Sequence, residues 1–155
     1  MDTTRYVAPG GGTKVFNQAV AGLTRLGFSV RGSRVLYVKG RTSGEWRSTP
    51  VNLLTHEGNR YLVAPRGTTQ WVRNLRAADG HGELHLGRRA EPFLATELDD
   101  DAKPDVLRAY LKRWKMEVGV FFDGVDAKAS DETLRQIAPG YPVFRIERAE
   151  SAPAR

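Results

Sequence analysis

Most of the apolar runs in this chain are joined by short turns, and this hairpin pattern constrains its fold more than any other feature. Residues 34–39 and 61–64 are rich in β-branched and aromatic side chains, and residues 83–86 and 93–98 flank the turn at Gly87. Runs of this kind with turn residues between them are typical of hairpins. Since parallel strands need a crossover of roughly a dozen residues or more, the pattern predicts an antiparallel sheet.

Two further strands are expected beside these hairpins. Residues 51–54 resume the sheet after the polar turn that follows Gly40, and they pair with residues 61–64 across a turn at 56–59. Residues 142–147 form the last predicted strand.

Four segments have features of helices. Residues 13–26 place apolar side chains at helical spacing, and residues 70–78 form a shorter helix. A longer helix opens at residues 99–101, where acidic side chains favour its positive end and Pro104 suits its first turn. Another short helix begins at Ser130. The elements together predict an α+β, mainly β fold, a small antiparallel barrel with helices at its rim.

Length and cysteine content limit the classes of protein that fit. The chain has 155 residues, which suits a single domain over residues 1–155 with a flexible lead at 1–12 and a flexible tail at 149–155. It contains no cysteine, which excludes disulfides, iron–sulfur ligation and a cysteine nucleophile. No apolar run reaches the ~18 residues of a membrane helix, and the N-terminus lacks the form of a signal peptide. A cytoplasmic protein is expected.

The basic side chains are concentrated in one part of the chain. The formal net charge is +6, and 18 of the 24 basic residues are arginine. Residues 1–90 carry 14 basic and 5 acidic side chains, whereas residues 91–132 carry 6 and 11. The planar arginine fork suits phosphate and carboxylate groups. This distribution favours an anionic partner for the first half, with composition bias and solubility as the alternative.

Two other roles for a basic protein fit less well. A nucleic-acid-binding module would need a recognition helix, a zinc finger or an aromatic RNA-binding motif, and none is visible. The acidic segment 91–132 would also repel a phosphate backbone. A membrane-surface anchor at residues 13–26 has only Lys14 and Arg25 to contact anionic lipid.

Sequences that superficially resemble known chemical motifs carry little weight here. His81, Glu83 and His85 would share one face of a strand, so a weak metal site is conceivable, although a solvated edge is favoured. The glycines at 10–12 lack the residue order of a phosphate loop, and no dinucleotide-binding fingerprint occurs. No metal is expected.

The segment 40–50, which joins two expected strands, is more informative. Gly40 and Gly44 allow a tight turn with exposed N–H groups. Hydroxyl and guanidinium donors follow closely in the same turn. These donors are capable of binding a phosphate, and the alternative is an arginine-decorated hairpin turn.

A second segment, 64–76, leads from a strand end through a glycine loop into the short helix. A helix start is a natural site for an anion. Trp71 is suited to line the binding site of a planar ligand, and Asn74 is suited to hold the loop in place. Core packing and a helix-surface position are the respective alternatives for these two residues.

The two segments in this order resemble the deazaflavin-dependent nitroreductase family, the coenzyme F-420-dependent nitro- and quinone-reductases of actinobacteria. Gly-Arg-Thr-Ser-Gly-x-x-Arg-x-x-Pro at 40–50 and Trp-x-x-Asn-Leu-Arg-Ala at 71–77 carry the resemblance, which runs from about residue 13 to the last strand. It implies a split β-barrel of the flavin-reductase type. It also implies a reduced 8-hydroxy-5-deazaflavin, coenzyme F-420, as hydride donor.

The resemblance also assigns binding roles. Arg41, Thr42, Ser43 and Arg47 would hold the phosphate and acidic tail of the coenzyme, although members of the family often have lysine where Thr42 stands. The residues implied around the rest of the coenzyme are Pro50 under the ring, Ala64 and Pro65 through their backbone, Arg66 and Gly67 in the loop over it, and Trp71 and Asn74 in the pocket wall.

The implied reaction passes a hydride to an activated acceptor such as a quinone, a nitroaromatic or an enone. Tyr141 is a candidate proton donor, with packing as its alternative and solvent as another proton source. Trp114, Phe121 and Phe122 line an apolar substrate pocket or pack in the core. Flavin or haem in the same barrel is the competing cofactor.

The partners expected from this reading are few. The expected partner is a small-molecule redox substrate, and no nucleic acid is expected to bind. The expected assembly is a monomer or a homodimer. Contact with a membrane surface is expected only where the acceptor is a quinone.

Overall fold

The computed structural model describes residues 33–149. The predicted lead 1–12, the predicted helix over 13–26 and nearly all of the predicted tail lie outside these residues. The strands are β1 (Ser33–Lys39), β2 (Trp46–Asn52), β3 (Leu54–His56), β4 (Asn59–Val63), β5 (His81–Leu86), β6 (Arg89–Glu97) and β7 (Val143–Arg148). The helices are α2 (Gln70–Ala77), α3 (Pro104–Val118) and α4 (Asp131–Ile137), with short 3-10 turns η1 (Asp100–Ala102), η2 (Gly119–Phe122) and η3 (Ala138–Gly140).

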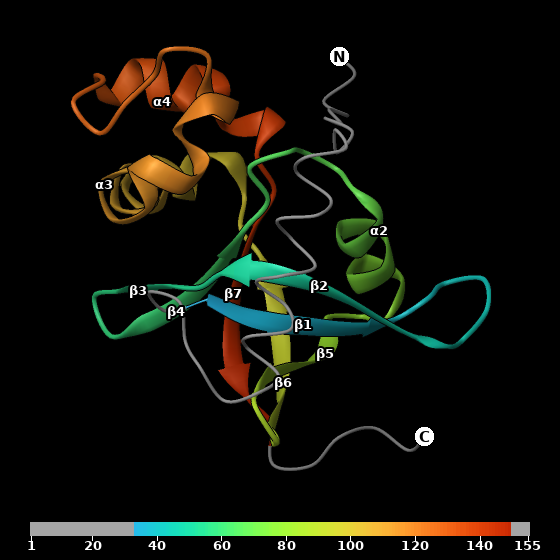
Figure 1. The fold of residues 1–155 in the computed structure, drawn as a ribbon. Coiled ribbons are helices and arrows are strands. Elements are labelled where there is room, and N and C mark those ends of the chain that lie inside the picture. Colours follow the sequence, from blue (N-terminus) through green and yellow to red (C-terminus); the bar gives the residue numbers. More distant parts are fainter. Residues whose placement is uncertain (1–32, 150–155) are drawn as a thin grey trace.

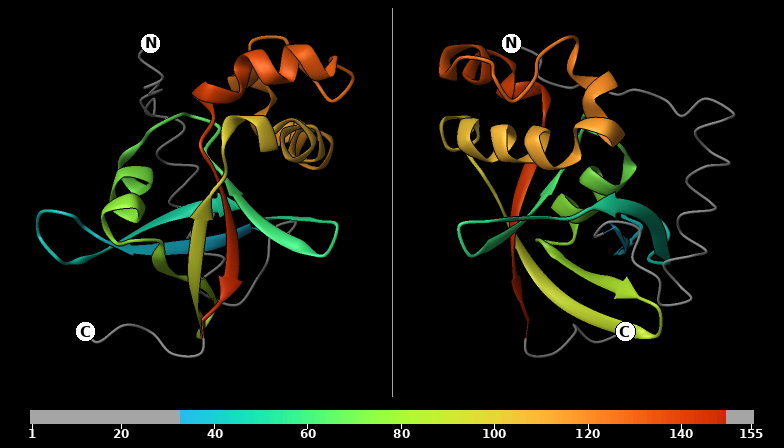
Figure 2. Two further views of the ribbon diagram at one scale, coloured as in Figure 1. Left: turned by 180° about the vertical axis from the view of Figure 1, so that it is seen from behind. Right: turned by 60° about the vertical axis from the view of Figure 1, so that its left-hand side comes forward.

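All seven strands join one antiparallel sheet in the order β2-β1-β5-β6-β7-β4-β3. Figures 1 and 2 show that the sheet is curled rather than flat, with α3 and α4 together at one end and α2 apart from them. The predicted antiparallel, split-barrel architecture with peripheral helices is therefore confirmed. The pairing of β4 with the distant β7 draws the sheet around the barrel interior.

The prediction for the second strand was wrong in its extent. β2 begins at Trp46 instead of residue 51 and pairs with β1 from Lys39–Trp46 to Ser33–Asn52. Because β2 is an edge strand in which Arg47 and Ser48 are exposed and the other residues are half-buried, it lacks the apolar alternation by which strands are recognised. The edge position also accommodates Pro50, which has no N–H to donate. Residues 51–54 do not form one strand, since Leu53 separates β2 from β3.

The apolar run at 61–64 is continuous because both faces of β4 are buried. Tyr61 and Val63 pack in a core cluster with α3 and α4, whereas Leu62 and Ala64 pack in a second cluster inside the barrel. The second cluster also contains Leu75 of α2. One strand thus connects the two cores.

The helices largely follow the sequence prediction. Ser130 caps α4, since its hydroxyl accepts a hydrogen bond from the Thr133 N–H at 3.1 Å. The acidic residues expected in the first turn of α3 lie mostly in the separate turn η1, and Pro104 is the first residue of α3. Lys103 occupies the N-cap position between them. The chain geometry changes again at Trp114, where non-helical torsion angles kink α3.

Candidate functional site

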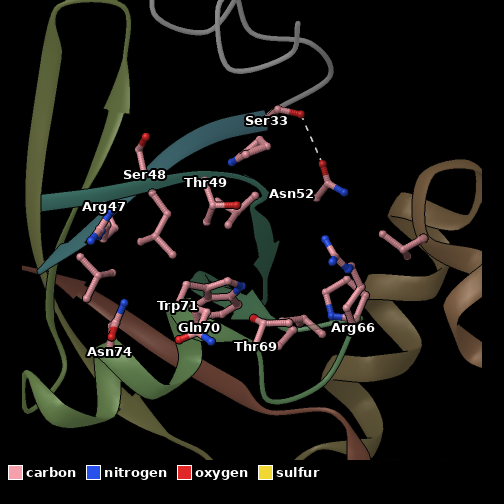
Figure 3. A pocket seen from close by; sticks show the side chains of 18 of the residues that line it. Ser33, Arg47, Ser48, Thr49, Asn52, Arg66, Thr69, Gln70, Trp71 and Asn74 are labelled. Atoms are coloured by element: carbon pink, nitrogen blue, oxygen red, sulfur yellow. Dashed lines mark hydrogen bonds between the residues drawn. The ribbon is translucent and has the colours of Figure 1, made fainter. Parts of the chain in front are cut away.

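A pocket of about 1120 Å³ opens between the β1–β2 hairpin, the loop after β4, the start of α2 and the second half of α3. Figure 3 shows that Arg47 and Asn74 lie on one side of it, that Ser33, Asn52 and Arg66 lie on the other, and that residues 69–71 lie between. The pocket therefore has two chemically different ends, which are described in turn.

The sequence-predicted binding residues come together in this pocket, with one exception. Gly67 does not line it, although its φ of +86° shapes the loop that does. The predicted residues that line the pocket are Arg41, Thr42, Ser43, Arg47, Pro50, Ala64, Pro65, Arg66, Trp71 and Asn74.

The basic end is built by the β1–β2 hairpin resting on α2. The hairpin closes through the Gly40 N–H, which donates to the Glu45 carbonyl at 2.7 Å. Asn74 is only 5% exposed, and its Oδ1 accepts hydrogen bonds from the Arg41 backbone N–H at 3.1 Å and from Arg41 Nη1 at 2.8 Å. Arg41 Nη1 also donates to Gln70 Oε1 at 2.9 Å. Asn74 therefore fixes both the backbone and the side chain of Arg41.

Thr69 at the start of α2 is a functional candidate that the sequence reasoning did not single out. It occupies the N-cap position with extended torsion angles, but its side chain makes no capping hydrogen bond. Its Oγ is buried without a hydrogen-bond partner, and the residue lines the pocket. A threonine before a helix signals an N-cap, whereas the burial of its hydroxyl in a pocket depends on the tertiary fold.

The other end combines apolar walls with Arg66 from the loop after β4 and with a few polar groups from α3 and β2. Burial raises the pKa of Tyr110 well above its ordinary value, although a hydrogen bond with Asn52 offsets part of the rise. Ser33 Oγ donates to Asn52 Oδ1 at 3.3 Å, as the dashed line in Figure 3 marks. Glu117 also lines this end. Apart from Arg66, the sequence analysis missed these polar residues, because β2 and α3 are distant along the chain.

The aromatic candidates divide between pocket and core. Trp114 and Phe121 line the pocket, and Trp114 Nε1 donates to the Leu53 carbonyl at 3.1 Å. Phe122 and Tyr141 do not line it, and their rings stack at a centroid distance of 4.2 Å. The Tyr141 hydroxyl donates to the Phe121 carbonyl. The structure thus places Tyr141 in the core, outside the pocket.

The candidate metal residues of β5 do not lie on a solvated edge as expected, because β5 lies between β1 and β6 and Glu83 is only 3% exposed. His85 Nε2 is 2.9 Å from Glu83 Oε1, and the His85 ring is 3.9 Å from that of Tyr37. Leu84, between them in sequence, packs inside the barrel. Within residues 33–149 no group of three potential metal-ligating side chains comes together. No helix in the same described range is long and apolar enough to cross a membrane.

The donor set suits a ligand with an acidic tail and a flat, partly apolar ring. Guanidinium and hydroxyl groups of the β1–β2 hairpin gather at one end, where phosphate and carboxylate groups would be bound. Pro50 and Trp71 add apolar surfaces to the lining, and the Thr69 hydroxyl is available without a hydrogen-bond partner. The pocket therefore fits a deazaflavin coenzyme in chemistry and in extent.

Solved structures share this fold at low sequence identity. A chain described as a domain-swapped dimer is 19% identical with a TM-score of 0.53, covering 84% of this chain and 92% of its own. HutZ, the heme storage protein from Vibrio cholerae, is 10% identical with a TM-score of 0.51, covering 79% and 84%. An F420-H2 dependent reductase, FDR-A, is 19% identical with a TM-score of 0.49, covering 76% and 95%.

Sequence comparison identifies a family. No curated protein matches the chain. The sequence model described as F420H(2)-dependent quinone reductase matches residues 14–127, which include both segments that suggested a deazaflavin enzyme and most of the pocket-lining residues. This match covers well over half of the chain, so the chain belongs to the F420H(2)-dependent quinone reductase family.

Proposed function

We propose that this protein, a coenzyme F-420-dependent reductase by its family, reduces quinone-type acceptors in the pocket between the β1–β2 hairpin and α3. The observation that carries the proposal is the continuity of this pocket. It joins a basic end at Arg41 and Arg47 to an apolar end at Trp114 and Phe121. A tailed coenzyme and a flat acceptor can therefore lie in one cavity.

The residues of the chain bind and orient in this scheme. Reduced coenzyme F-420 supplies the hydride when it is bound. Arg41 and Arg47 bind the acidic groups of its tail, and Asn74 holds Arg41 in place. Trp71, which contacts Phe144 at a ring-centroid distance of 5.9 Å, forms a fixed wall for the ring. Holding both reactants in one orientation accelerates a transfer that needs close approach.

The proton that accompanies the hydride is supplied at the α3 end. Burial raises the pKa of Tyr110, so its hydroxyl keeps its proton and can donate a hydrogen bond to an acceptor oxygen. Among the described residues that line the pocket, Glu117 is the one carboxylic acid. Its neighbours Met116 and Val120 are exposed, so this end of the pocket lies close to solvent as an alternative proton source.

Coenzyme binding is the first test. The protein is titrated with coenzyme F-420 and followed by ring fluorescence, with flavin mononucleotide and haemin as competing ligands. Arg41→Ala and Arg47→Ala should each weaken coenzyme binding about 1.4- to 5-fold, since exposed charge pairs contribute ~0.2–1 kcal/mol. Arg73→Ala is the matched control, because Arg73 is exposed on α2 and does not line the pocket. No saturable change with the coenzyme, or tighter binding of flavin or haem, would refute the proposal.

The acceptor class is tested separately. A quinone, a nitroaromatic and an enone are compared as oxidants of the reduced coenzyme under identical conditions. The walls at Trp114, Val118 and Phe121 suit a flat apolar acceptor, and the family is described as quinone reductases, so the quinone should give the highest kcat/KM. A higher value for either of the other two would contradict the assignment.

The assembly proposed is a homodimer. This is supported by the domain-swapped dimer that shares the fold. Light scattering should give twice the chain mass of 17.2 kDa. A single-chain mass at micromolar concentration would favour a monomer.

A further inference from the structure

The start of α2 presents an arrangement that the fold itself does not explain. Thr69 has the extended torsion angles of a capping residue, φ −83° and ψ −177°, yet its hydroxyl caps nothing. The residue is 9% exposed, and its Oγ is buried without a hydrogen-bond partner. Buried hydroxyl groups almost always have a partner. A polar atom held in this way inside a pocket is available to bind a ligand atom.

The amino end of α2 beside Thr69 also has polar groups without hydrogen-bond partners inside the helix. The first intrahelical hydrogen bond of α2 runs from the Arg73 N–H to the Thr69 carbonyl at 3.2 Å. The N–H groups of the preceding helical residues have no carbonyl one turn earlier to bind. They carry the partial positive charge of the helix end. The hydroxyl of Thr69 and the amino end of α2 therefore both favour an electron-rich oxygen.

The position of Thr69 indicates which part of a ligand this oxygen belongs to. Arg41 contacts α2 at Gln70 and, one turn further on, at Asn74. Figure 3 shows Thr69 on the far side of Gln70 from Asn74 and Arg47, towards Arg66. The helix end thus lies away from the hairpin arginines Arg41 and Arg47, where an acidic tail would lie, and on the side of Arg66.

We propose that the Thr69 hydroxyl and the amino end of α2 bind an oxygen of the deazaflavin ring rather than its phosphate or glutamate tail. The inference rests on the proposed function, because it assumes that the pocket holds this coenzyme. Thr69 donates its hydroxyl hydrogen to the ring oxygen, and the helix end stabilises negative charge on that oxygen. The hydrogen bond from Thr69 fixes the position of the ring in the pocket, while the hairpin arginines fix the tail of the coenzyme.

The test compares two ligands and three variants. The ligands are coenzyme F-420 and the deazaflavin nucleoside that lacks phosphate and glutamate, both titrated by ring fluorescence. Thr69→Val removes the hydroxyl at constant shape, and Thr69→Ser retains it. Thr68→Val is the matched control, because Thr68 is 8% exposed but does not line the pocket. Thermal unfolding of each ligand-free variant verifies that it is folded.

Thr69→Val is expected to weaken both ligands by the same factor, about 3- to 10-fold, as for the loss of one hydrogen bond. Thr69→Ser and Thr68→Val should remain within about 2-fold of the wild type. Equal binding by Thr69→Val and the wild type would overturn the inference while leaving the proposed function intact. A loss confined to the full coenzyme would overturn it too, since the hydroxyl would then bind the tail. A wild type that binds neither ligand would refute the proposed function and this inference together.

Discussion

Replacing Asn74 with alanine should release the β1–β2 hairpin from α2 and lower both stability and coenzyme affinity. The Asn74 side chain is 5% exposed, and its Oδ1 accepts two hydrogen bonds from Arg41. A neutral backbone hydrogen bond contributes about 1 kcal/mol, and one from a guanidinium contributes somewhat more. Since Arg41 itself is exposed, we expect a total loss of about 2–3 kcal/mol in the free energy of unfolding.

Urea denaturation followed by tryptophan fluorescence measures this loss. The urea concentration at the unfolding midpoint should fall, while the dependence of the unfolding free energy on urea concentration stays unchanged. Gln70→Ala is the matched control, because Gln70 accepts one exposed hydrogen bond from the same guanidinium. It should cost at most about 0.5 kcal/mol. Coenzyme affinity should fall only slightly in the control, since Asn74 still holds Arg41.

A double-mutant cycle with Arg41→Ala separates the two hydrogen bonds. Arg41→Ala keeps the backbone N–H that donates to Asn74 Oδ1, so Asn74→Ala should still cost about 1 kcal/mol in that background. A loss for Asn74→Ala no larger than that for Gln70→Ala would refute the reasoning. So would an unchanged coenzyme affinity, because Asn74 would then not be needed to position Arg41.

Three further perturbations have expected outcomes. Thr69→Val should raise the unfolding free energy of the ligand-free protein by about 1–2 kcal/mol in a urea titration, because it removes a buried hydroxyl that has no partner. Glu91→Gln should flatten the acid side of a plot of urea midpoint against pH. The hydrogen bond from Arg60 lowers the pKa of Glu91. The stabilisation that the Glu91 carboxylate contributes is therefore fully present above the ordinary carboxyl pKa, and it is lost as the pH falls through the lowered pKa of the folded protein. Gly80→Ala should destabilise the protein more than Gly44→Ala in the same titration. Both glycines have positive φ, but an added Cβ at Gly80 meets a backbone oxygen at 2.2 Å, whereas at Gly44 it meets nothing within 4 Å.

Local sequence signals were sufficient for much of the fold. The hairpin at Gly87 and the cap at Ser130 follow from turn and capping residues that act on their immediate neighbours. The polar edge strand β2 was partly missed, because only its pairing with β1 orders it. The pairing of β4 with β7 joins residues about 80 positions apart, and no local pattern encodes it.

The residues of the candidate site likewise divide into those that local sequence predicts and those that only the tertiary fold brings together. The residues of the hairpin and of α2 belong to contiguous motifs, so their types and spacing were informative. Asn52 and Tyr110 come from β2 and α3 and meet only when the sheet curls. Thr69 is visible in the sequence as a helix cap, yet its value as a binding group depends on burial without a partner.

Ion pairs within the fold neutralise part of the basic surplus of the first half. Arg60 pairs with Glu91, and Arg76 forms two hydrogen bonds with Glu97, so the acidic segment after residue 90 compensates these two arginines. Arg41 differs, because the oxygens it contacts belong to neutral amides. Amide oxygens orient a guanidinium without cancelling its charge. Arg41 therefore keeps its positive charge at the hairpin end of the pocket, where it can act on the acidic tail of a coenzyme.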